Sequence, residues 1–154
     1  MSKFEAKLRK YIEDNKIEAD VISFNQSTHS VAEAANAVGA NPEDFVKSIC
    51  MIGPSDELIV AIVKGEHRAS TSRVAKALGI ERPRIAKPDE MLEKSGYPVG
   101  GTPAFGYLAL FLIDPRVMEK EKVYSGGGSE QALTYMSTKE IQRANNAKMV
   151  RVRS

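Results

Sequence analysis

The chain has 154 residues, the size of one domain, and its 42% hydrophobic and 27% charged residues are ordinary for a globular protein. A net charge of +2 is too balanced for a protein that packages nucleic acid by charge alone, and a single cysteine excludes an intramolecular disulfide or a multi-cysteine zinc site. No apolar run reaches the roughly 18–20 residues of a membrane span, and the N-terminus lacks the apolar stretch of a secretion signal. We therefore expect one cytoplasmic domain spanning residues 1–154.

The first half of the chain predicts short helices alternating with strands. Serine followed three residues later by glutamate, the capping-box pattern, precedes two of the helices, and five residues between two apolar runs predict a hairpin. The expected elements are a helix at 3–15, a strand at 20–24, a helix at 31–38, one helical turn after Asn41, strands at 46–52 and 58–63, and helices at 70–78 and 88–94.

The second half opens with a loop at 98–106 that contains two prolines and three glycines. A third capping-box pattern, Ser137 with Glu140, opens the last helix. About half a dozen strands are thus interleaved irregularly with short helices, which indicates an α+β fold rather than regular β-α-β winding. The expected elements after the loop are strands at 108–113, 122–124 and 132–136, a helix at 137–145 and a strand at 149–152.

The loop around Gly100 and Gly101 is a first candidate for chemistry. Glycines let the backbone approach a ligand, and successive amides can bind an anion, although a tight connection before a buried strand explains the loop slightly better. The loop has neither the lysine and serine or threonine of a P-loop nor the spacing of a dinucleotide fingerprint.

Lys47 lies in an apolar strand and shares a face with Ile49 and Met51. Such a lysine usually points to solvent, but an inward ammonium would need an anion. Cys50 falls on the opposite face, where a small buried thiol is expected. His29 and His67 have no metal-ligand spacing, and we interpret both as surface or capping residues.

Positive charge is concentrated at residues 64–87. Seven Lys and Arg against two Glu give this segment +5, whereas the whole chain carries only +2. A solvated helix face and a phosphate-binding face explain the concentration about equally well.

Six short segments of the chain are informative when they are taken together and in order. They are 31–39 (VAEAANAVG), 45–48 (FVKS), 63–70 (VKGEHRAS), 74–79 (VAKALG), 95–106 (SGYPVGGTPAFG) and 123–127 (VYSGG). Together they resemble the YbaK and prolyl-tRNA synthetase-associated editing domains. The resemblance covers roughly residues 27–145, and its most specific part is a Gly-Gly-x-Pro loop.

The resemblance implies a mixed β-barrel of about six to seven strands surrounded by short helices. It also implies hydrolysis of mischarged aminoacyl-tRNA at the 3′-terminal adenosine, without a metal or another cofactor. The family's lysine and glycine loop correspond to catalytic residues Lys47, Gly100 and Gly101. We expect substrate contacts from Ser48, Thr102, Pro103, Ser125 and Gly126, and contacts to acceptor-stem phosphates from Lys64, Arg68, Arg73 and Lys76.

This sequence departs from some members, which carry a histidine in a late H-P-x-T-N element. The matching stretch, residues 124–131, has no histidine and looks more like the YbaK branch, whose substrate is cysteinyl-tRNA for proline. The Gly-Gly loop is also one residue shorter than the common spacing. Water, or a hydroxyl or thiol of the substrate, therefore remains open as the attacking group.

The leading hypothesis is a free-standing deacylase that edits in trans, on cysteinyl-tRNA for proline or a tRNA carrying another small amino acid. A non-catalytic module that binds tRNA ends or nucleotides, and an esterase for small acyl esters, are the alternatives. The expected partner is the acceptor end of a mischarged tRNA, with an aminoacyl-tRNA synthetase as a further candidate. No membrane partner is expected, and the chain is expected to be a monomer or a homodimer.

Overall fold

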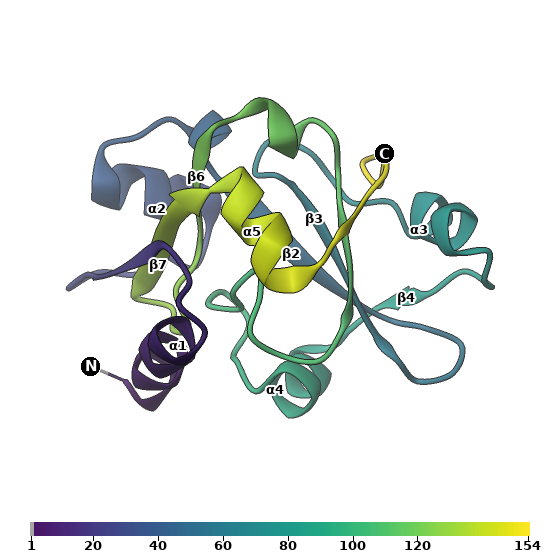
Figure 1. The fold of residues 1–154 in the computed structure, drawn as a ribbon, viewed down its shortest axis with the longest axis horizontal. Helices are drawn as coiled ribbons and strands as arrows, with labels where there is room; N and C mark the ends of the chain where they lie inside the picture. Colours follow the sequence, from purple (N-terminus) through teal and green to yellow (C-terminus); the bar gives the residue numbers. More distant parts are fainter. Residues whose placement is uncertain (1) are drawn as a thin grey trace.

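A computed structural model describes residues 2–154; Met1, the first residue of the expected domain, lies outside the described residues. The fold is α+β, as predicted, with five α-helices and two sheets in this range (Figure 1). The elements are α1 (Lys3–Asp14), β1 (Ala19–Ser23), α2 (Val31–Val38), β2 (Val46–Ile52), β3 (Leu58–Lys64), α3 (Thr71–Leu78), β4 (Arg84–Ile85), α4 (Pro88–Ser95), β5 (Leu110–Ile113), β6 (Lys122–Gly126), β7 (Ala132–Ser137), α5 (Thr138–Asn145) and β8 (Lys148–Met149), with 3-10 helices at Pro42–Asp44 and Val117–Glu119.

The strands form an antiparallel sheet in the order β1-β7-β6 and a mixed sheet in the order β4-β2-β3-β5-β8. A single bridge between Phe45 and Tyr124 joins the two sheets. The predicted closed barrel is therefore wrong for the described residues. β4 and β8, the edges of the five-stranded sheet, have only two residues each and are too short to carry the ladder around to closure.

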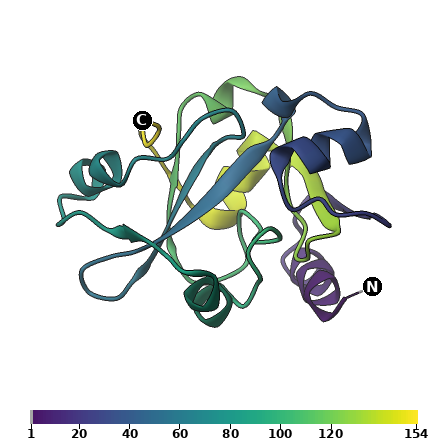
Figure 2. The same cartoon turned by 180° about the vertical axis from the view of Figure 1, so that it is seen from behind.

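β3 is the centre of the fold and is buried on both faces from Leu58 to Val63. On one face, Val60 and Ile62 pack into a large core with α1, α4 and α5. On the other, Ala61 and Val63 pack with α3 and the C-terminal segment. Figure 2, seen from behind, shows α2 and α3 at opposite ends of the long β2-β3 hairpin. A continuous apolar run is what such a two-sided strand requires.

Three strand predictions need correction. The strand expected at 108–113 begins at Leu110, and Leu108 is 93% exposed. The strand expected at 149–152 is only Lys148–Met149, because the following amides of Val152 and Arg153 donate to the buried carboxylate of Asp114, at 3.0 and 3.1 Å. β4 was not predicted, since two residues show no periodicity. Among residues 2–154, no helix has the length and apolar character needed to span a membrane.

Candidate functional site

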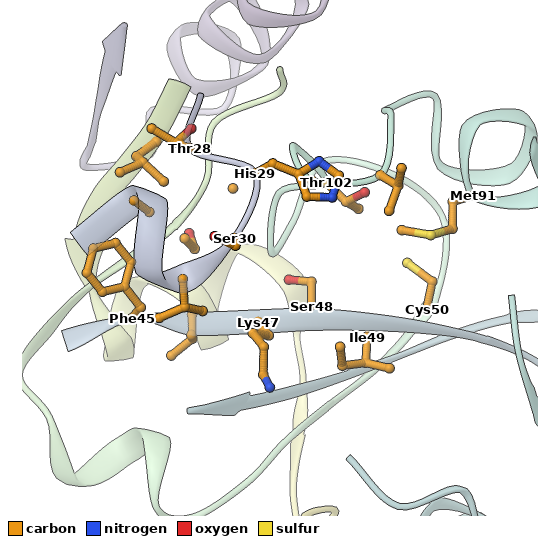
Figure 3. A pocket seen from close by; sticks show the side chains of 18 of the residues that line it. Thr28, His29, Ser30, Phe45, Lys47, Ser48, Ile49, Cys50, Met91 and Thr102 are labelled. Atoms are coloured by element: carbon orange, nitrogen blue, oxygen red, sulfur yellow. The ribbon is translucent and has the colours of Figure 1, made fainter. Parts of the chain in front are cut away.

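A pocket of about 340 Å³ opens beside β2, where residues 28–31, the loop from Val99 to Thr102 and the end of β6 meet (Figure 3). Six residues that the sequence predicts for the site line this pocket: Lys47, Ser48, Gly100, Thr102, Ser125 and Gly126. The predicted residues that do not line it are Gly101, Pro103, Lys64, Arg68, Arg73 and Lys76.

The alternation of β2 divides the strand between two environments. Ser48 and Cys50 point toward Thr102 and Met91, whereas Lys47 and Ile49 point to the other side of the strand (Figure 3). The Cys50 thiol is buried, as expected, and burial raises its pKa to about 12, so it is not a thiolate near neutral pH. The Ser48 hydroxyl has no hydrogen-bond partner within residues 2–154.

Lys47 is a partly buried cation whose Nζ makes no ion pair or hydrogen bond with any described residue. Burial and then the positive charge of Arg68 lower the pKa of Lys47. The backbone at Lys47 lines the pocket, but the ammonium lies on the opposite side of β2 from Ser48 (Figure 3). A half-buried ammonium beside a guanidinium is an arrangement that an incoming anion would stabilise.

Gly100 and Gly101, two of the three glycines of the 98–106 loop, are closely packed. Gly100 has φ of +84°, and a Cβ there would lie 2.3 Å from Nδ1 of His29. At Gly101 a Cβ would lie 2.6 Å from the carbonyl carbon of Ser129. The Gly128 amide donates to the Gly101 carbonyl at 2.8 Å. The loop is thus held against residues 128–129 with no room for a side chain.

Two of the three amides of Gly100, Gly101 and Thr102 have no hydrogen-bond acceptor among residues 2–154. Gly101 donates its N–H to the carbonyl of Pro98 at 3.1 Å and is therefore occupied. The amides of Gly100 and Thr102, which both line the pocket, have no acceptor in the part of the chain that the structure describes. Two unpaired amides beside a pocket are suited to bind a developing negative charge on oxygen.

His29 is exposed, which confirms the interpretation of a surface residue, but the sequence interpretation missed that it lines the pocket. Its Nδ1 lies 3.2 Å from Oε1 of Glu130, and the two side chains are 45% and 53% exposed. No spacing could have revealed this pair, because its members are 101 positions apart in the sequence. The apolar end of the pocket was missed for the same reason; it is formed by Cys50, Ile85, Ala86, Pro88, Met91 and Val99.

The basic residues predicted to bind tRNA lie outside the pocket and differ in their pairing. Lys64 is neutralised by Glu66 at 2.8 Å, whereas Arg68, Arg73 and Lys76 form no ion pair within residues 2–154. The amide of Ser70 donates to the carbonyl of Val152, which brings the C-terminal segment beside α3. That segment adds two cations which the sequence interpretation did not include, Lys148 and Arg151, each bonded only to backbone carbonyls.

No group of three or more His, Cys, Asp or Glu side chains in the described range is arranged to hold a metal ion. The ionisable residues among those that line the pocket are His29, Lys47 and Cys50.

Comparison with known proteins identifies the family. Residues 25–144 match the model of the aminoacyl-tRNA editing domain. The uncharacterized protein YwhH of Bacillus subtilis is 25% identical over 134 residues, which are 86% of this chain and 85% of YwhH. Proline–tRNA ligase of Thermotoga neapolitana is 27% identical over 71 residues, which are 46% of this chain and 12% of the ligase.

A similar solved structure is that of a candidate trans-editing enzyme for prolyl-tRNA synthetase. It superposes with a TM-score of 0.91 and 25% identity, over all of this chain and 99% of that one. The matched family model spans most of the chain, from before α2 into α5, and so includes the pocket and both loops that border it. The chain belongs to the aminoacyl-tRNA editing domain family.

Proposed function

We propose that this protein hydrolyses the ester bond of a mischarged aminoacyl-tRNA, as a free-standing cytoplasmic deacylase that edits in trans. One observation carries the proposal: Gly100 and Thr102, whose amides have no acceptor among residues 2–154, line the same pocket as an apolar end formed around Cys50 and Met91. An aminoacyl ester is already activated, so its hydrolysis requires positioning and charge stabilisation more than a strong nucleophile.

The pocket accommodates the aminoacyl group. We assign the side chain of the amino acid to the apolar end and the ester carbonyl to the amides of Gly100 and Thr102. With about 340 Å³ for the whole aminoacyl end and the sugar that carries it, the pocket favours a small amino acid such as cysteine. We assign the Ser48 hydroxyl, which has no hydrogen-bond partner among residues 2–154, to bond the ester or the amino group.

Lys47 has a different partner in this proposal. Because its ammonium points away from the Ser48 side of β2, we assign it to a phosphate of the tRNA end rather than to the ester carbonyl. Arg68, Arg73 and Lys76 then meet phosphates further along the acceptor stem. Binding through these cations should weaken as the salt concentration rises.

The comparisons support a tRNA for proline as the substrate. A solved structure with a similar fold is described as a candidate trans-editing enzyme for prolyl-tRNA synthetase, and part of a proline–tRNA ligase is similar in sequence. We therefore propose cysteine, or another small amino acid, on tRNA for proline. Prolyl-tRNA synthetase is the candidate protein partner.

The test is release of amino acid from purified Cys-, Ala-, Ser- and Pro-tRNA by the wild type, Lys47→Ala and Lys139→Ala. Lys139 is exposed on α5, away from the pocket, and controls for the loss of a lysine. We expect turnover on one mischarged tRNA, lost in Lys47→Ala and kept in Lys139→Ala. Binding of tRNA with no turnover on any substrate would contradict a deacylase and favour a non-catalytic tRNA-binding module.

A further inference from the structure

We propose that His29, oriented by Glu130, is the general base that activates the attacking water. This inference rests on the proposed deacylase function and names a residue for it. The family resemblance in the late part of the chain offers no histidine, yet the fold brings one to the pocket from the loop before α2. The pair of His29 and Glu130 is the observation that carries the inference.

The pair brings a base close to an acid. Nδ1 of His29 lies 3.2 Å from Oε1 of Glu130, and in our proposal the nearby carboxylate keeps the proton of the neutral ring on Nδ1. The other ring nitrogen, Nε2, then has a free lone pair that can accept a proton. The same logic orients the histidine of a serine hydrolase, where a carboxylate fixes the tautomer.

The backbone fixes the pair in place. Thr28 donates to the carbonyl of Glu130 through both its N–H, at 2.6 Å, and its hydroxyl, at 3.1 Å. The amide of His29 donates to the hydroxyl of Ser27 at 3.2 Å. The segment carrying the base and the segment carrying the acid are therefore tied together by these hydrogen bonds, independently of the contact between the two side chains.

The ring also lies next to an amide that the proposal uses. A Cβ at Gly100 would fall 2.3 Å from Nδ1 and 2.8 Å from Cε1 of His29, so the imidazole packs directly on Gly100. The unpaired Gly100 amide and the histidine thus border the same part of the pocket. A base and an oxyanion donor on either side of one carbonyl are what ester hydrolysis needs.

No other ionisable side chain on the described pocket wall can take this role. The Cys50 thiol holds its proton, because burial raises its pKa to about 12. The Lys47 ammonium lies on one side of β2, and the Ser48 hydroxyl lies on the other side, which faces the pocket. Glu130 faces Nδ1 of His29 but does not itself line the pocket.

In the proposed hydrolysis, Nε2 of His29 first accepts a proton and later returns it. Water attacks the carbonyl carbon while Nε2 takes one of its protons, and the tetrahedral oxyanion bonds to the amides of Gly100 and Thr102. The bond between the carbonyl carbon and the ribose oxygen then breaks, and the imidazolium returns the proton to that oxygen. The products are the free amino acid and tRNA with an intact terminal ribose, and His29 is neutral again.

The test is single-turnover deacylation of the mischarged tRNA that the wild type cleaves, between pH 5.5 and 8.5. We expect His29→Asn to lower the rate by about 10²- to 10³-fold, with tRNA affinity little changed, and to abolish the fall in rate on the acid side. Glu130→Gln keeps an acceptor for Nδ1–H but not the charge, so we expect about a tenfold loss. His67→Asn, the same exchange at a histidine outside the pocket, is the control.

The outcomes separate the two proposals. A His29→Asn variant with the wild-type rate and pH profile overturns the assignment of the base and leaves the deacylase function intact. A wild type that releases amino acid from no tRNA overturns both. If His29→Asn fails to fold, Glu130→Gln decides: an unchanged rate overturns the role of the pair, and a tenfold loss at unchanged melting temperature supports it.

Discussion

Gly126→Ala is expected to destabilise the protein through close contacts with the backbone of Gly101 and Thr102. A Cβ at Gly126 would lie 2.2 Å from the carbonyl oxygen and 2.7 Å from the carbonyl carbon of Thr102. Ordinary contact begins at 3.4 Å, so one backbone must move by roughly 1 Å. Neither moves easily, because Gly126 is paired with Leu133 of β7 and the Thr102 loop is tied to Gly128 through Gly101.

Overpacking of this kind costs roughly 1–3 kcal/mol in the free energy of unfolding. In a domain of this size that corresponds to a melting temperature lower by about 3–10 °C, measured by calorimetry. Gly65→Ala is the matched control, because its methyl would meet the side chains of Val31 and Phe45 at 3.1 and 3.3 Å and no backbone. We expect that control to stay within about 1 kcal/mol of the wild type. Equal melting temperatures for the two variants would refute the reasoning.

Three further predictions follow from buried ionisable groups. Burial by itself would raise the pKa of Asp114, but the N–H groups of Arg116, Val152 and Arg153 and the Arg153 guanidinium lower it. The ionised Asp114 therefore stabilises the fold fully at pH values above the pKa that its carboxyl has in the unfolded chain. This stabilisation is lost as the pH falls through the lower pKa that the carboxyl has in the folded protein. Asp114→Asn should lower the free energy of unfolding by about 2 kcal/mol at pH 7, measured by urea unfolding. The variant should also lose less stability than the wild type as the pH falls below about 4. An equal loss of stability in both proteins over that pH range would contradict this prediction. Cys50, with its pKa raised to about 12, should react with Ellman's reagent at pH 8 at least about a hundredfold more slowly in the native protein than in urea, and comparable rates would show an accessible thiol. Lys47→Met should lose turnover. Its melting temperature should equal or exceed that of the wild type, because the substitution removes a partly buried charge that lies beside Arg68 and has no partner among the described residues. A lower melting temperature would mean that the ammonium stabilises the fold.

The elements that the sequence predicted well are those whose signal is local. Residues 46–52 and 58–63 are long apolar runs around a five-residue turn, and both strands are confirmed. The helices after Ser30 and Ser137 begin where a serine side chain accepts the N–H three residues on, and both are confirmed. The closed barrel came from the resemblance alone, and strand lengths of two residues at β4 and β8 prevent it.

The pocket shows why the site was only partly predictable. Lys47, Ser48 and the Gly100 loop were found through short motifs, each contained in a few consecutive residues. The pairing of His29 with Glu130 depends on how β1 and β7 align, because that register sets residues 24–28 beside 130–132. Likewise, the occupied amide of Gly101 is a property of the turn that starts at Pro98 and not of residue type. Long-range register and local turn geometry are the two kinds of information that a single sequence did not supply.

Our proposal divides recognition between two parts of the substrate. The pocket wall between Cys50 and Met91 is apolar, and an apolar pocket separates amino acids that differ by one methylene by only about 10- to 200-fold. In the proposal, the cations on the other side of β2 bind phosphates, and phosphate contacts position a nucleic acid without reading its sequence. Neither part alone therefore distinguishes a wrongly charged tRNA from the correctly charged tRNAs of the cell. In our proposal, selectivity for one tRNA has to come from bases at the acceptor end or from a synthetase that presents the mischarged product. The panel of aminoacyl-tRNAs, assayed with and without prolyl-tRNA synthetase, separates these two sources: a preference that exists without the synthetase belongs to the protein's own contacts.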